Sequence, residues 1–151
     1  MSIAVSLFLV AAMCEAIKDK GDLALNLSDS LPGKLFFVAR NSPRESIAFL
    51  KGDHVAFTHP LIPGMVIKRV AGLPGECVSH RDGVAFVEDR RIGEIFSKSH
   101  KVRSISPGFV GVIPEGYVFV AGLHPRSFDS RYKEMGLVKK EKVRGKAYRV
   151  L

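Results

Sequence analysis

The sequence predicts a mostly β protein, a folded-over antiparallel sheet domain with many short turns. Ten phenylalanines contribute to its apolar residues, and 14 glycines and 8 prolines interrupt the chain at short intervals. Hydrophobic residues make up 46% and charged residues 25% of the 151 residues, which is the balance of a globular domain and not of a disordered chain. This length suits one domain with a real core. Short apolar runs between turn residues are typical of antiparallel β folds.

The N-terminus predicts a short apolar helix that directs the chain to a membrane, so we divide the chain into residues 1–20 and 21–151. No charged residue occurs from Ser2 to Cys14. The run is shorter than the ~20 residues that span a bilayer comfortably. We expect it to be retained, because no basic residue precedes it and "AAMCEA" is an imperfect cleavage site. A buried helix of the domain itself is the alternative.

Strand-like runs follow, separated by turn signals such as "NSPRES", "GLPGE" and "SHRDG". They cover residues 34–39, 54–58, 65–71, 83–87, 109–113 and 116–121. Two basic stretches interrupt this pattern. We expect residues 89–106 to be a surface excursion and residues 139–146 to be a solvated face.

The run at residues 65–71 contains a lysine in an otherwise suitable buried strand. Strand alternation places Val66, Lys68 and Val70 on one face and Ile67 and Arg69 on the other. If the valine face is the core face, Lys68 is buried, and burial lowers a lysine pKa until the amine can act as a base. Taken alone, a lysine that snorkels from an edge strand is the simpler interpretation.

Three segments could carry chemistry: "SDSLPG" (28–33), "VIKRVAGLPGE" (66–76) and "GLHPRSFDSRY" (122–132). Each has an ordinary interpretation by itself, but in this order they resemble the motifs of the type I signal peptidases. That family has serine, any residue, serine, an apolar residue and a nearby proline. It then has a strand ending in Lys-Arg-Val before a Gly-Leu-Pro-Gly turn, and finally Ser-x-Asp-Ser-Arg. "KGDHVAF" and the Gly-Lys-Ala at residues 145–147 match two further motifs.

The resemblance covers Leu27 to Val150 and is closest to the conjugative-transfer (TraF-type) branch. Pro32 and Gly33 directly follow Leu31, and "GLHPR" stands where the housekeeping enzymes have a "GDNR" stretch. The absence of a large inserted β domain also suits that branch. The resemblance implies a β domain of the signal-peptidase type.

The resemblance also implies a serine-lysine peptidase. Ser30 would attack the scissile carbonyl, and neutral Lys68 would take its proton and return it to the leaving amine. The Ser28 hydroxyl and the Ser30 backbone N–H would form the oxyanion hole. Ser127 would orient the Lys68 amine, and an Asp129–Arg131 ion pair would hold the last motif in place. We expect no metal or other cofactor.

The implied substrate is a preprotein with small residues near its cleavage site, and we expect a conjugative prepilin, hydrolysed or cyclised. The expected location is the bacterial inner membrane, with the catalytic domain on the periplasmic face. Membrane lipid is an expected partner. Nucleic acid is not expected, because the net charge of +8 is poor support for nucleic-acid binding when it suits anionic membrane lipid equally well. The alternatives are a housekeeping signal peptidase, a non-catalytic component of a conjugation or type IV secretion apparatus, and a self-cleaving repressor, for which no helix-turn-helix is evident.

Other catalytic arrangements have weaker support in the sequence. "SRYK" at residues 130–133 has the Ser-x-x-Lys spacing of penicillin-binding enzymes, but their other motifs are missing. The five histidines do not occur in a recognisable triad context.

Overall fold

The computed structural model describes residues 20–25, 31–40, 48–97 and 105–151. The predicted apolar helix falls within residues 1–19, outside the described residues, and so do Ser28 and Ser30. In the described part of the chain, no helix combines the length and the apolar character needed to cross a membrane.

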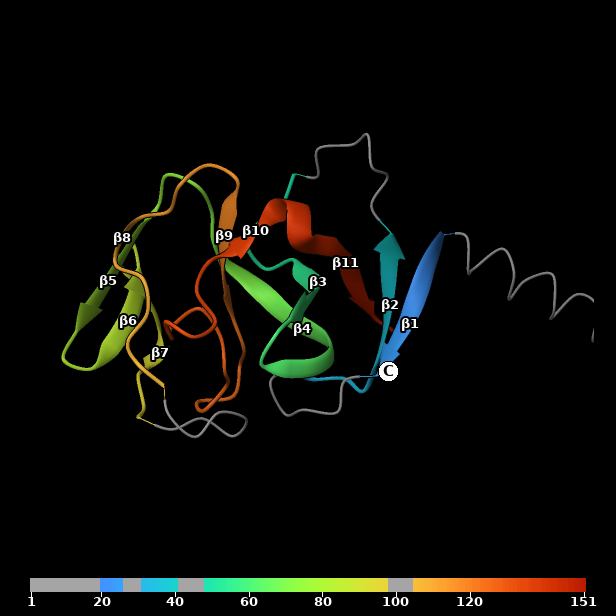
Figure 1. Cartoon of the computed structure of the whole chain (residues 1–151), viewed down its shortest axis with the longest axis horizontal. Coiled ribbons are helices and arrows are strands. Elements are labelled where there is room, and N and C mark those ends of the chain that lie inside the picture. The colour runs from blue at the N-terminus through green and yellow to red at the C-terminus, as the bar shows by residue number, and fades with distance from the viewer. Residues whose placement is uncertain (1–19, 26–30, 41–47, 98–104) are drawn as a thin grey trace, which may run out of the picture.

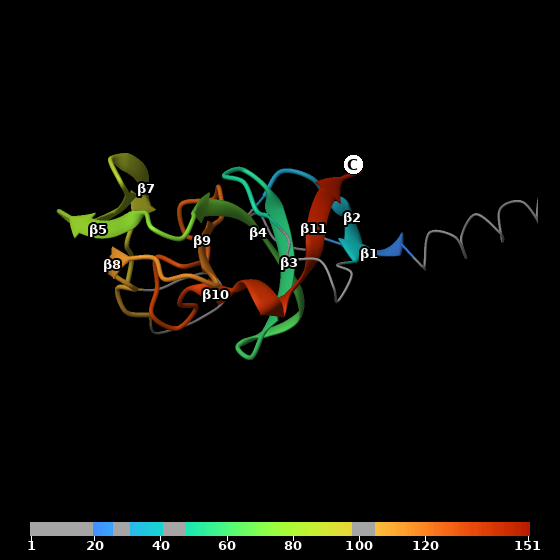
Figure 2. The same cartoon turned by 90° about the horizontal axis from the view of Figure 1, so that it is seen from above.

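The described residues form two antiparallel sheets that lie side by side (Figures 1 and 2). The seven-stranded sheet has the order β1-β2-β11-β3-β4-β9-β10, and the four-stranded sheet has the order β7-β6-β5-β8. The strands of the larger sheet are β1 (Gly21–Leu25), β2 (Leu35–Arg40), β3 (His54–His59), β4 (Ile62–Gly72), β9 (Tyr117–Ala121), β10 (Val138–Lys139) and β11 (Val143–Arg149). Those of the smaller sheet are β5 (Cys77–Arg81), β6 (Val84–Val87), β7 (Arg90–Glu94) and β8 (Gly111–Val112). A 3-10 helix, η1 (Lys140–Lys142), links β10 to β11.

The predicted mostly β, antiparallel fold is confirmed. Each of the six predicted runs contains or overlaps a strand, namely β2, β3, β4, β6, β8 and β9. The five strands that the sequence pattern did not identify are β1, β5, β7, β10 and β11.

The two basic stretches are largely exposed in their described parts, but they contain strands that the sequence pattern did not reveal. Residues 139–146 are not simply a solvated face, because β11 begins at Val143 and pairs with β2 on one side and β3 on the other. Val143, Gly145 and Ala147 of this strand are buried, and the basic residues between them are more exposed. Residues 89–106 contain β7, whose buried Gly93 contradicts a purely surface excursion.

The core divides over the two faces of the larger sheet. On one face Val66 and Val70 of β4 pack in a cluster with residues from β3, β9 and the segment after β9, including Phe128 and Tyr132. On the other face Ile67 belongs to a second cluster. The remaining members of that cluster are Ala24, Leu31, Phe36, Val38, Ala56 and Ala147. A third cluster lies at the junction with the smaller sheet.

Candidate active site

Lys68 lies in the middle of β4, a central strand between β3 and β9. It pairs with Val55 of β3, and only 3% of its surface is exposed. The neighbouring core residues on its face are Val66 and Val70, as the strand alternation predicted. A snorkelling lysine on an edge strand is therefore the wrong interpretation. Such burial disfavours the ammonium form, because a charge loses its hydration in the interior.

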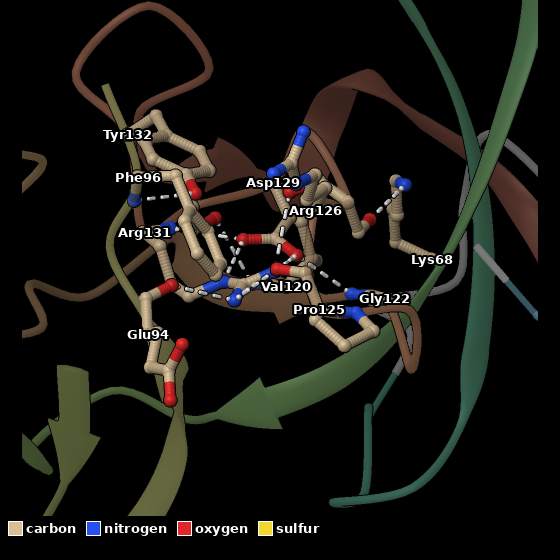
Figure 3. A network of polar contacts seen from close by, with 12 residues as sticks. Lys68, Glu94, Phe96, Val120, Gly122, Pro125, Arg126, Asp129, Arg131 and Tyr132 are labelled. Carbon is tan, nitrogen blue, oxygen red and sulfur yellow. Dashed lines mark hydrogen bonds and ion pairs between the residues drawn. The ribbon is translucent and has the colours of Figure 1, made fainter. Parts of the chain in front are cut away.

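The Lys68 amine is oriented by a residue that is distant in sequence. Its Nζ donates a hydrogen bond of 2.7 Å to the Oγ of Ser127, which is itself only 3% exposed (Figure 3). Ser127 lies in the loop that follows β9, and its backbone N–H donates to the carbonyl of His124. The structure thus brings together two predicted site residues that are 59 positions apart in the chain.

Asp129 and Arg131 form a buried ion pair next to Ser127. The Arg131 Nε and Nη2 donate to the two carboxylate oxygens of Asp129 at 2.8 and 2.9 Å. Arg131 Nη2 also donates to the Ser127 carbonyl at 3.2 Å, so the pair holds the backbone of the lysine-orienting residue. Burial by itself lowers the pKa of Arg131, but the hydrogen bond and the charge of Asp129 outweigh it, and the pKa is raised above its ordinary value.

The same loop is fixed to β9 by a residue whose role the sequence analysis missed. Ser130 is fully buried, and its Oγ accepts the Val120 N–H at 3.0 Å and donates to the Gly136 carbonyl at 2.7 Å. Asp129 adds a contact by accepting the Gly122 N–H at 2.9 Å. Ser130 is therefore a structural link, which argues against "SRYK" as a catalytic motif. The Ser-x-Asp-Ser-Arg motif includes Ser130 but does not reveal these backbone partners.

The turn after β4 is held by Glu76, which closes the "GLPGE" segment. Its carboxylate accepts the Leu73 N–H at 2.8 Å and pairs with the Lys51 amine. Arg90 of β7 lies 3.7 Å from the same carboxylate. Burial alone raises the pKa of Glu76, but the hydrogen bonds from Lys51 and Leu73 outweigh it and the pKa lies below its ordinary value. The end of β4 is thereby fixed relative to the smaller sheet.

The other predicted chemical groups do not form a competing site in the described part of the chain. Those residues contain no group of three or more His, Cys, Asp or Glu side chains that could hold a metal. The rings of His54 and His59 pack edge-on against Phe36 and Phe128. The buried Nε2 of His80 has no hydrogen-bond partner among the described residues.

Comparisons with known proteins identify the family. A model of the signal peptidase family, peptidase S26, matches residues 1–151. The chain belongs to this family. It is 32% identical over 105 residues to signal peptidase I of Bacillus licheniformis, covering 64% of this chain and 56% of that protein. The chain therefore spans little more than half the length of this relative.

Among solved structures, the chain is similar to a signal peptidase I from Enterococcus faecalis. The two are 28% identical with a TM-score of 0.45, over 68% of this chain and 98% of the other. Membership of the signal peptidase family agrees with the expected family. The conjugative-transfer branch stays a prediction.

Proposed function

We propose that this signal peptidase family member is a serine endopeptidase that removes leader peptides from exported preproteins. Ser30 is the nucleophile and Lys68 the general base. The observation that carries the proposal is the position of Lys68, 3% exposed on a central strand and bonded to the Ser127 hydroxyl at 2.7 Å. A serine hydroxyl needs an adjacent base to become an effective nucleophile, and a desolvated lysine amine provides one.

The described neighbour of Ser30 belongs to the core beside β4. Leu31 is 4% exposed and belongs to the same hydrophobic cluster as Ile67, the residue before Lys68 in β4. This cluster lies on the face of the larger sheet opposite to Lys68, so it anchors the chain next to the proposed nucleophile at β4 without involving the amine. In this mechanism Ser30 attacks the scissile carbonyl while Lys68 accepts its proton, and Lys68 then protonates the leaving amine. The Ser28 hydroxyl and the Ser30 backbone N–H stabilise the oxyanion.

The first prediction tests this pair in the full-length chain in membranes. Ser30→Ala and Lys68→Met should each lower the cleavage rate of a co-expressed preprotein by about 10⁴-fold or more, the cost of losing a nucleophile or its base in a serine peptidase. Lys68→Arg should be equally inactive, because a guanidinium is not deprotonated in proteins. Cleavage is measured as the ratio of mature protein to precursor, and folding by thermal unfolding of the purified variants.

The matched control is Lys139→Ala, which removes a half-exposed lysine from the same sheet and should cleave normally. Normal cleavage by folded Lys68→Met or Lys68→Arg protein would exclude Lys68 as the base. A folded wild-type chain that cleaves no preprotein would favour the alternative of a non-catalytic component of a secretion apparatus.

We further propose that the substrate is a conjugative pilin precursor with small residues at its cleavage site. The support is the sequence of the nucleophile motif, in which Pro32 and Gly33 directly follow Leu31. Parallel assays of a prepilin and a general secretory preprotein distinguish this substrate from that of a housekeeping signal peptidase. Mass spectrometry of the product distinguishes hydrolysis from cyclisation, because a cyclic pilin is one water lighter than the linear one.

The proposed location is the bacterial inner membrane, with the β domain on the periplasmic face. The uncharged run from Ser2 to Cys14 and the net charge of +8 support contact with anionic membrane lipid. Digestion of the β domain by a protease added to spheroplasts is expected. Protection until the spheroplasts are lysed would contradict this orientation.

A further inference from the structure

We propose that strand β7, which lies outside every motif that identifies the family, fixes the position of the Ser127 loop relative to Lys68. This inference rests on the proposed role of Lys68 as general base. β7 is an edge strand of the smaller sheet, so only one of its sides is paired, with β6. Its two ends bind the two segments that carry the lysine and the serine.

The C-terminal end of β7 is bound by Arg131. The Nη1 of this residue donates to the Glu94 carbonyl and to the Pro125 carbonyl, each at 2.9 Å (Figure 3). Its Nη2 donates to the Ser127 carbonyl at 3.2 Å. One guanidinium, fully used by carbonyl and carboxylate acceptors and 1% exposed, thus connects β7 to the residue that orients Lys68.

Close packing strengthens this connection at Gly93. A Cβ added to Gly93 would lie 2.7 Å from the Arg131 Nη1. Such a separation leaves no room for a methyl group, so the guanidinium would have to move. Because its other nitrogens are bonded to Asp129 and to the Ser127 carbonyl, that movement would displace the loop as well. Three residues beyond Gly93, the Phe96 N–H donates to the Tyr132 hydroxyl at 3.2 Å, a second contact with the same loop.

The N-terminal end of β7 is bound to the lysine strand. Arg90 Nη2 donates to the carbonyl of Ala71 at 2.8 Å, three residues beyond Lys68 in β4. The same side chain lies 3.7 Å from the Glu76 carboxylate that closes the following turn. The five-residue strand therefore spans from the end of β4 to the Ser127 loop and fixes the separation between them.

The second prediction compares two variants at the ends of β7 with one between them. In Gly93→Ala, kcat for preprotein cleavage should fall about 10- to 100-fold, since small misplacements of catalytic groups have effects of this size, while KM stays within about twofold. Arg90→Ala should change kcat in the same direction by a smaller factor. Arg91→Ala is the matched control, because this exposed neighbour contacts only the Glu94 side chain among the bonds described, and it should behave as wild type.

A double-mutant cycle separates positioning from general destabilisation. If β7 acts through Ser127, adding Gly93→Ala to Ser127→Ala should reduce kcat little further, whereas a general loss of structure would reduce it by the full factor. The proposal would be overturned if the reductions in kcat from Gly93→Ala and Ser127→Ala were additive. It would also be overturned if the variants changed KM alone, or if both Gly93→Ala and Arg90→Ala kept the wild-type kcat. If Gly93→Ala does not fold, the Arg90→Ala cycle with Ser127→Ala decides the matter.

A readout that does not depend on activity separates this inference from the proposed function. Brief labelling with acetic anhydride, quantified by mass spectrometry, reports the access of Lys68 relative to the exposed Lys142. Labelling of Lys68 should rise severalfold in Gly93→Ala and Arg90→Ala and stay at the wild-type level in Arg91→Ala. Unchanged labelling in both end variants contradicts the role of β7. If the wild-type protein is inactive but the labelling pattern is as expected, only the proposed peptidase function is contradicted, and the role of β7 stands.

Discussion

At the scale of single residues, the buried Asp129–Arg131 pair is the strongest electrostatic feature of the site. The exposed fractions of its two side chains are 0% and 2%, and the two groups make parallel hydrogen bonds of 2.8 and 2.9 Å. Such a pair is costly to desolvate and is stable only while both partners are present. The remaining Arg131 donors are bound by backbone carbonyls, so among the described residues Asp129 is the one carboxylate that is hydrogen-bonded to this side chain.

The third prediction is that Asp129→Ala destabilises the protein by about 3–5 kcal/mol, because it leaves a buried guanidinium without its counter-ion. The free energy of unfolding is measured by urea titration at pH 7. Asp22→Ala is the control: it removes a bidentate pair with Arg40 that is solvent-exposed, and it should cost no more than about 1 kcal/mol. Equal losses of unfolding free energy in the two variants would show that the buried pair stabilises the protein no more than the exposed pair does.

The site residues could be predicted from the sequence because the motifs identify them, and strand alternation shows on which face of its strand Lys68 lies. Alternation correctly placed Lys68 with Val66 and Val70. It did not show that β4 is a central strand, since that depends on β3 and β9 pairing with it from distant parts of the chain. The contacts of Ser130 and Arg131 with backbone groups were equally inaccessible, because a backbone acceptor leaves no mark in the sequence.

At the scale of elements, β11 shows why apolar patterns missed some strands. It lies between β2 and β3, yet two of its three buried positions are Gly145 and Ala147. Small residues are needed there because the neighbouring backbone is close: a Cβ at Gly145 would lie 1.7 Å from the carbonyl oxygen of Ala39. A strand whose buried side chains are this small has almost no hydrophobic periodicity. The charged residues of this segment therefore led to its interpretation as a solvated face. In β7 the buried residue Gly93 has the same effect.

The fourth prediction is that Gly145→Ala prevents stable folding or costs more than the roughly 1–3 kcal/mol typical of overpacking, because the methyl group meets backbone that cannot rotate away. Gly116→Ala is the matched control. At Gly116 an added Cβ meets nothing within 4 Å, and only the positive φ of 82° is unfavourable, so about 1–2 kcal/mol is expected. The two urea unfolding curves are compared directly. Similar midpoints would contradict the close approach of β11 to β2.

At the scale of the whole molecule, the titrating groups make stability depend on pH in one direction. Burial lowers the pKa values of His54, His59 and His80 below their usual 6.5. Burial alone raises the pKa values of Asp53 and Glu76, but hydrogen bonds from Lys146 and Lys51 among others outweigh it and leave both pKa values lowered. In every case the unfolded chain binds protons at a higher pH than the folded protein, so stability falls as the pH falls.

The fifth prediction follows from the order of these pKa values. The urea midpoint should begin to fall as the pH drops through the unfolded histidine value of 6.5. It should fall again below the unfolded carboxylate values of 4.5 for Glu76 and 3.8 for Asp53, where the favourable pairs are progressively lost. A His54→Gln, His59→Gln, His80→Gln triple variant should lose the first fall and keep the second, because only the first requires charging of buried imidazoles. A wild-type midpoint that stays constant from pH 7 to about pH 5.5 would contradict the histidine contribution, while leaving the carboxylate contribution to be read from the lower range.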